Sequence, residues 1–263
     1  MVRLGGRGGR AGAVIKTYDG WGVWWRWTLA CSMGLVIGLP LGIGLAWIAL
    51  YWLEVQVLLV GAVVGFCVGS ALGVAQGIVI RRVLPVAAGR WAVMTVAGAI
   101  GGSIGGALVI AGSERLLGVT GWVLAPVSGA LLGAIIGLAQ RLALPRYFPR
   151  GWWVLASSVS WCLGVSIFTG GFAFMWDPWM ATAASPGGYS PMLIVGLVAN
   201  PVVAIVFIGA TSGAVMAWLV VRRIPPTSCL SCGYDLRGTA GNICPECGEQ
   251  SPAAPAPSYS RTS

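Results

Sequence analysis

The stretch RWTLACSMGLVIGLPLG, residues 26–42, returns in related form as RWAVMTVAGAIGGSIGG, residues 90–106. Both stretches open with Arg-Trp and later carry glycine at every fourth position, and they are separated by an offset of 64 residues. Because residues four apart lie on one face of a helix, each stretch predicts a helix with a stripe that has no side chains. Such stripes let helices approach closely in lipid, where van der Waals packing is the main source of helix association.

The same offset continues into the next predicted helix. There a run of spaced glycines ends in a glutamine, and the matched pairs are Gly65 and Gly129, Gly69 and Gly133, Gly73 and Gly137, Gln76 and Gln140, Arg82 and Arg146, and Pro85 and Pro149. The sequence therefore predicts two tandem hairpins, at about 26–86 and 90–150. A third, eroded hairpin is predicted at 150–224, with Gly209, Gly213 and Ala217 in its second helix and no glutamine to close it.

The composition is typical of a membrane protein. Hydrophobic residues make up 57% and charged residues only 9% of the 263 residues, and the mean hydropathy is +0.85. A soluble domain carries about 25% charged residues. Six apolar runs are long enough to cross about 30 Å of hydrocarbon, and they lie at about 28–50, 57–80, 91–111, 122–144, 152–175 and 192–221. We predict an all-α polytopic membrane protein whose six transmembrane helices, within residues 26–224, form tandem glycine-zipper hairpins.

The net charge of +9 is distributed unevenly between the predicted loops. Of the 16 Lys and Arg residues, all except Arg115 fall on one side of the predicted spans. The positive-inside rule places that side, with both termini, in the cytoplasm, and the chain is predicted to lie in the inner cell membrane. The basic N-terminal tail, residues 1–25, is predicted to be disordered, and the Arg-Trp pair is expected to anchor each hairpin at the lipid headgroups.

The predicted spans carry almost no ionisable side chain away from their ends, and the chain contains no histidine. Transporters and proton relays are usually marked by such groups. The sequence contains no recognisable nucleophile–base pair, phosphate loop or paired carboxylates, so we predict that the protein is not an enzyme. The polar residues of interest within the spans are Gln76, Gln140 and Asn200. Their amides are expected to hydrogen-bond between packed helices, and the alternative is that they line a pore.

The composition changes abruptly after VVRRIPP, residues 220–226. The next segment places Cys229, Cys232, Cys244 and Cys247 in the pattern C-x2-C-x11-C-x2-C. Two residues between cysteines let both thiolates of a pair face one ion, and two pairs complete a tetrahedral shell of four sulfurs. The pattern predicts a structural zinc site, with iron as the alternative metal because tetrahedral thiolates accept both. Metal binding would supply the folding energy of so short a segment.

The same cysteines carry a resemblance. The stretches CLSCGYDLRGT and CPECG, within residues 228–249, resemble the short zinc-ribbon modules found at the ends of many bacterial proteins. The resemblance implies a closed structural zinc site with these four cysteines as ligands. The membrane part is similar to bacterial polytopic membrane proteins with G-x3-G-x2-Q helices, a likeness that implies no activity. We assign residues 225–250 to the ribbon and the Pro/Ala/Ser-rich residues 251–263 to a disordered tail.

Three functions fit these features. The leading one is a non-enzymatic integral membrane protein that displays the cytoplasmic ribbon to a protein partner, with Tyr234, Asp235 and Arg237 as the candidate contact surface. The second is a channel or transporter for a small neutral or anionic solute, which requires the three amides and Ser160 to converge on one cavity. The third is nucleic-acid binding by the ribbon. The small number of basic residues there, beside a membrane that attracts the same charges, argues against it.

Overall fold

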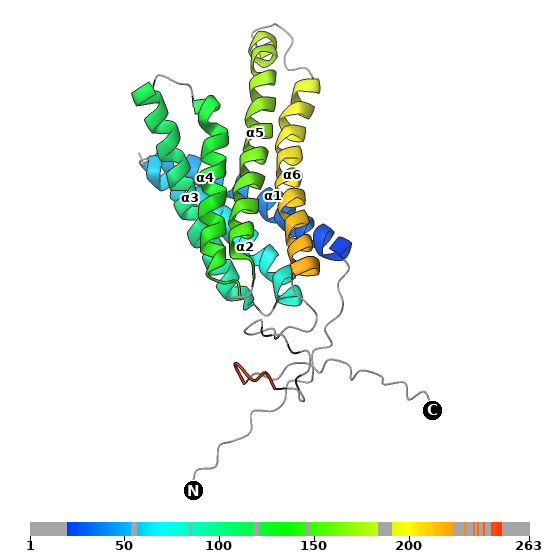
Figure 1. The fold of residues 1–263 in the computed structure, drawn as a ribbon. Helices are drawn as coiled ribbons and strands as arrows, with labels where there is room; N and C mark the ends of the chain where they lie inside the picture. The colour runs from blue at the N-terminus through cyan, green and yellow to red at the C-terminus, as the bar shows by residue number, and fades with distance from the viewer. Residues whose placement is uncertain are drawn as a thin grey trace, which may run out of the picture.

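A computed structural model gives the arrangement of the membrane part (Figure 1). It describes residues 20–53, 57–84, 86–117, 121–145, 148–183, 191–223, 229, 234, 236, 239 and 243–248. Within these residues the structure consists of long helices that alternate in direction along the chain. They are α1 (Gly20–Leu53), α2 (Val57–Val83), α3 (Ala88–Leu117), α4 (Gly121–Arg141), α5 (Arg150–Ala183) and α6 (Pro191–Arg223).

All six helices are long and apolar enough to cross a membrane, which confirms the predicted all-α, multi-pass architecture at that level. Two boundaries differ most from the prediction. α1 begins at Gly20, so residues 20–25, which the sequence placed in the tail, are helical. Trp24 connects this first turn to α6, because its Nε1 donates to the carbonyl of Ala210 at 3.0 Å. α5 continues to Ala183, beyond the predicted end of its span at residue 175.

The helices pack as a closed cycle. Each packs against its neighbours along the chain, and α1 packs against α6. Figure 1 shows α1 and α2 running obliquely across the more upright α5 and α6. Glycines lie where neighbouring helices are closest: a β-carbon at Gly34 would stand 2.6 Å from the Cα of Leu72, and one at Gly98 would stand 2.7 Å from the Cα of Ile136. These separations are shorter than a side-chain carbon permits, so only glycine fits there.

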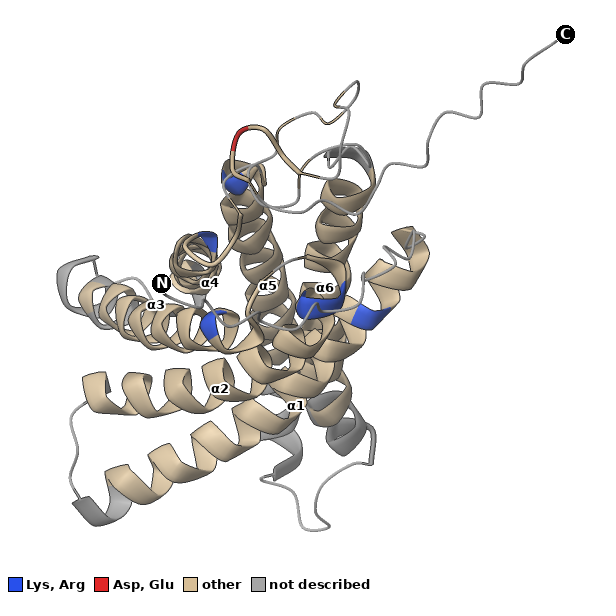
Figure 2. Ribbon diagram, turned by 90° about the horizontal axis from the view of Figure 1, so that it is seen from below, with Lys and Arg blue, Asp and Glu red and all other residues tan. Residues whose placement is uncertain are grey.

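The basic side chains gather at one end of the bundle, where α1, α3 and α5 begin and α2 and α4 end. Figure 2 views this end, with the described Lys and Arg residues in blue around the helix ends. A belt of arginine at one edge of apolar helices is the distribution from which the positive-inside rule infers orientation. The cytoplasmic location of this end stays a prediction. The described arginines of the belt are Arg26, Arg81, Arg82, Arg90, Arg141 and Arg150.

Candidate functional site

Three tryptophans meet at the centre of the bundle. Trp27 of α1, Trp91 of α3 and Trp153 of α5 are 1%, 0% and 2% exposed, respectively. Their ring centroids lie 5.5 to 6.0 Å apart. The Trp27 ring meets the rings of Trp91 and Trp153 edge-on, and the rings of Trp91 and Trp153 are tilted relative to each other. The expectation that the Arg-Trp pairs anchor the hairpins at the headgroups is therefore wrong for Trp27 and Trp91. Their indoles fill the core, where their N–H groups have acceptors.

Each of the three indole N–H groups donates to a helix that precedes its own in the cycle. Trp91 donates to Oε1 of Gln76 in α2 at 3.1 Å, and Trp153 donates to Oε1 of Gln140 in α4 at 3.0 Å. Trp27 donates to Oγ of Ser212 in α6 at 3.3 Å, so the last helix supplies the acceptor for the first. Sequence reasoning missed Ser212, because a lone serine in a span gives no signal of such a role.

The two glutamines connect these hydrogen bonds into one buried network. Nε2 of Gln140 lies 3.0 Å from Oε1 of Gln76 and 3.0 Å from Oγ1 of Thr95, and it donates to both. Nε2 of Gln76 lies 3.2 Å from the sulfur of Cys31. Gln76 and Gln140 are 5% and 1% exposed, and their amides bond to protein groups that join α1, α2, α3, α4 and α5.

A small cavity lies beside this network. Its volume is about 20 Å³, and its polar lining comes from five helices, α1, α2, α4, α5 and α6, with contributions from Cys31, Gln76, Gln140, Ser157, Ser160 and Ser212. A cavity of this size holds about one water molecule, and its several polar groups meet the water's need for two to four partners. Gln76, Gln140 and Ser160 thus converge on one space, but that space has the dimensions of a single water.

Asn200 lies elsewhere. Its Nδ2 donates to the carbonyl of Phe168 at 2.8 Å, and its side-chain amide fills the position that a β-carbon at Gly171 would occupy. Asn200 therefore joins α6 to α5 and is not among the residues that line the central cavity.

The contacts of the third hairpin give it a register that differs from the predicted one. Gly73 and Gly137 face Ala92 and Val154, which directly follow Trp91 and Trp153 in the chain; Gly213 in the same way faces Thr28, which follows Trp27. The residue three positions after each of these glycines is Gln76, Gln140 and Met216, respectively. An Arg-x2-Pro motif begins six residues after each of those positions, as Arg82 with Pro85, Arg146 with Pro149, and Arg222 with Pro225. Met216, which is 1% exposed, occupies the place of the missing glutamine.

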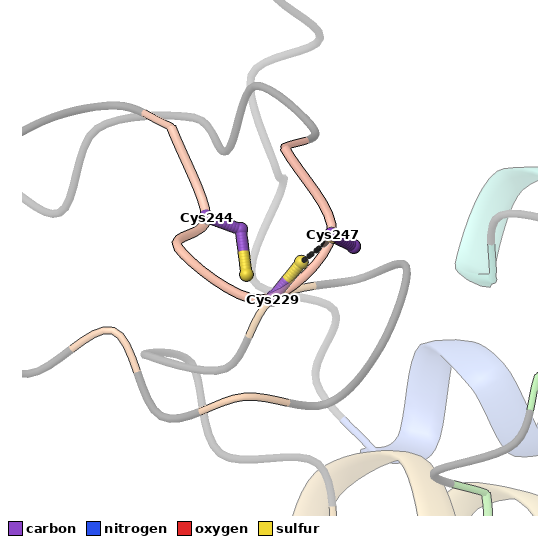
Figure 3. Close-up of side chains that lie close together, drawn as sticks. All are labelled: Cys229, Cys244 and Cys247. Atoms are coloured by element: carbon purple, nitrogen blue, oxygen red, sulfur yellow. Dashed lines mark hydrogen bonds between the residues drawn. The ribbon is translucent and has the colours of Figure 1, made fainter.

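The cysteine cluster beyond α6 brings together ligands from two segments of the chain (Figure 3). The sulfurs of Cys229, Cys244 and Cys247 all lie within 4.8 Å of one another, and those of Cys229 and Cys247 are 3.6 Å apart. A disulfide would require about 2.05 Å. Four sulfurs held about 2.3 Å from one zinc ion stand about 3.8 Å apart at the edges of a tetrahedron, so the observed spacing suits a shared metal ion.

Backbone geometry supports the cysteine pair at residues 244–247. The N–H of Gly248 donates to the carbonyl of Cys244 at 2.9 Å, which closes a tight turn around the pair. Gly248 has φ of +69°, a left-handed conformation that glycine adopts at no steric cost. On the other segment, the N–H of Cys229 donates to the carbonyl of Tyr234 at 2.8 Å. Cys229 and Cys244 are buried, at 2% and 1% exposure.

The remaining predicted site residues fall in different places. Tyr234 is 39% exposed and so belongs to the surface beside the cysteine cluster. Cys232, Asp235 and Arg237 lie outside the described residues. Three of the four predicted ligands thus form a cluster that can hold a metal ion, and the fourth ligand and the identity of the metal stay predictions.

Comparisons with known proteins do not place the chain in a family: no protein-family model, no curated protein and no solved structure matches it. The resemblance of residues 228–249 to zinc-ribbon modules therefore stays a prediction that rests on the cysteine pattern.

Proposed function

We propose that the chain is a non-enzymatic multi-pass membrane protein that displays a structural zinc ribbon to a protein partner in the cytoplasm. The observation that carries this proposal is the convergence of Cys229, Cys244 and Cys247, whose sulfurs lie within 4.8 Å of one another. Cys232, three residues past Cys229 in the C-x2-C pattern, would be the fourth ligand. Four thiolates close the coordination shell, so the metal would have a structural role and not a catalytic one.

The arrangement of the chain supports a display role. The ribbon follows α6 directly, so it would be held at the arginine-rich end of the bundle, which the positive-inside rule assigns to the cytoplasm. The bundle itself is closed by its own contacts, and its central amides bond to each other and to tryptophan N–H groups. In this proposal three tandem glycine-zipper hairpins form the scaffold. Tyr234, which is 39% exposed, begins the candidate contact surface.

Transport is not the function that the contacts favour. A solute path built on the polar residues of the spans needs Gln76, Gln140, Ser160 and Asn200 in one cavity. The first three line a cavity of about 20 Å³, and Asn200 bonds between α5 and α6. The amides therefore support packing of the scaffold in this proposal.

Removal of one thiolate is expected to remove the metal. We expect wild-type protein, purified without added metal, to contain about one zinc ion per chain. Cys244→Ser should lower this to a small fraction, because a tetrahedral thiolate site loses a ligand and the fold that the metal supports. Cys67→Ser is the matched control, since Cys67 is buried within α2. Elemental analysis measures zinc and iron in each protein. Equal zinc in Cys244→Ser and wild type would contradict the zinc site, and one iron per wild-type chain would identify the bound metal as iron.

Loss of the ribbon fold is expected to remove specific neighbours. A proximity-labelling enzyme fused to the C-terminus of the full chain would be compared in wild type and in the double variant Cys232→Ser and Cys247→Ser. At equal membrane abundance, a defined set of cytoplasmic proteins should be labelled in wild type and lost in the variant. The Cys67→Ser protein should keep this set. An identical set in all three proteins would contradict the display role while leaving the metal site in place.

A further inference from the structure

A groove runs along the outer face of the α1–α2 hairpin. It has a volume of about 690 Å³, and apolar side chains dominate its lining. Small residues form its floor, where the helices are closest: Gly34 of α1 and Ala71 and Ala75 of α2. Larger exposed side chains, including Met33 and Ile78, stand along its sides.

The groove spans about one leaflet of a bilayer. Along α1 it extends from Trp25 to Ile37, which corresponds to about 18 Å at 1.5 Å per residue. Half of a hydrocarbon core of about 30 Å is about 15 Å. A transmembrane helix from a partner protein would continue across both leaflets, whereas an acyl chain ends near the middle of the bilayer. The length of the groove therefore favours a lipid as its occupant.

The end of the groove at the arginine-rich rim carries positive charge. Arg26 of α1 and Arg82 of α2 line it there, and none of its lining residues is acidic. The guanidinium carbon of Arg26 lies 5.6 Å from the centroid of the Trp25 ring, so the indole holds this cation at the mouth of the groove. Guanidinium groups match the geometry of phosphate oxygens, and basic pockets between membrane helices bind anionic headgroups.

The corresponding place on the next hairpin is built differently. Arg90 occupies the position of Arg26 at the offset of 64 residues, but its Nη2 donates to the carbonyl of Leu142 at 2.6 Å. Gly89 stands where the first hairpin has Trp25, so the aromatic wall is missing there. The combination of two arginines, an indole and an apolar groove thus distinguishes the α1–α2 hairpin from the α3–α4 hairpin, which lacks the indole.

We propose that the α1–α2 groove binds one phospholipid with an anionic headgroup. Its phosphate lies between Arg26 and Arg82, and one acyl chain lies over Gly34, Ala71 and Ala75. Packing of the chain in the groove does not select among phospholipids, because every acyl chain reaches it from an apolar surrounding and gains only van der Waals contact. The two arginines add preference for a headgroup with net negative charge.

The test is a titration of the purified full-length protein in neutral detergent, with bound lipid counted by native mass spectrometry. Dioleoyl phosphatidylglycerol should bind with one saturating site, and dioleoyl phosphatidylcholine should bind at least about tenfold more weakly. Arg26→Gln with Arg82→Gln should abolish this difference. Arg81→Gln with Arg141→Gln is the matched control, because it removes the same charge from two exposed arginines outside the groove. This control should keep the preference for phosphatidylglycerol.

Two further arms separate the groove from its alternatives. Ala75→Leu fills the floor while keeping both arginines, and it should weaken phosphatidylglycerol binding; unchanged binding would overturn the placement of the chain in the groove. Glycerol 3-phosphate at the concentration of the lipid should not displace it, and displacement would make this a phosphate site without a lipid. Equal weakening by the two arginine pairs would mean that the lipid responds only to the charge of the rim, which would also overturn the proposal.

Discussion

Gly65→Leu is expected to prevent the membrane bundle from assembling, whereas Gly44→Leu is expected to leave it intact. A β-carbon at Gly65 would stand 2.6 Å from the carbonyl oxygen of Ala99 and 2.7 Å from the Cα of Ile100. Both are backbone atoms of α3, so no side-chain rotation relieves the clash and the two helices must separate. Inserting side-chain atoms into packed sites costs about 1–3 kcal/mol and more where the backbone must move. A whole leucine here exceeds what a marginally stable bundle tolerates.

Gly44 provides the control because it lies in α1 and a β-carbon there meets no described atom within 4 Å. The measurement is the monodisperse fraction after detergent extraction, together with the melting temperature of that fraction. We expect Gly65→Leu to aggregate, Gly65→Ala to melt at a lower temperature than wild type, and Gly44→Leu to match wild type. A wild-type melting temperature for Gly65→Leu would show that α2 and α3 do not approach each other at this glycine.

The second large effect is expected at the centre of the network. Gln140→Leu removes the acceptor of the Trp153 indole and the donor that reaches Gln76 and Thr95. Hydrogen bonds between membrane helices contribute about 0.6 kcal/mol each on average. A buried donor left without an acceptor costs a further 1–3 kcal/mol or so. We therefore expect the free energy of unfolding to fall by about 3 kcal/mol.

A double-mutant cycle tests whether the indole hydrogen bond is the cause. Trp153→Phe removes the donor, so adding it to Gln140→Leu should cost less than adding it to wild type. The free energies of unfolding, measured by reversible denaturation in mixed detergent, should show a coupling of about 1 kcal/mol between the two positions. Strictly additive losses would mean that Trp153 and Gln140 do not interact.

The sequence predicts the helices of this protein better than it predicts which side chains meet between them. Apolar runs and a fixed offset predict six spans, because crossing a bilayer imposes length and composition on each helix separately. The position of an indole is not imposed in this way. A tryptophan next to arginine suits the headgroup region. Only the packing of the helices shows that Trp91 donates to Gln76, 15 residues away, and that Trp27 donates to Ser212, 185 residues away.

The third hairpin illustrates the same limit. Its glycines align with the earlier copies in two registers, and the predicted one takes Gly209, Gly213 and Ala217 as the three small residues. The contacts of Gly213 with Thr28 select the other register, in which Met216 replaces glutamine. The Arg-x2-Pro signature at Arg222 and Pro225 is the sequence feature that identifies this register. The cysteine pattern indicates its candidate ligands directly, because thiolates with two residues between them can face one ion.

The contact of α1 with α6 forms late in biogenesis, because α6 is synthesised after all the other helices. Trp27 and its acceptor Ser212 are separated by 185 residues. At synthesis rates of about 5–20 residues per second, Ser212 emerges roughly 10–40 s after Trp27. During that interval α1 is already in the membrane, while the face that it later presents to α6 borders lipid or the insertion machinery. A ribosome that stalls before α6 therefore leaves a nascent chain in which the α6-facing side of α1, with Trp24 and Trp27, has no partner helix. Quality-control proteases could distinguish this exposed helix face from the packed face of the finished protein.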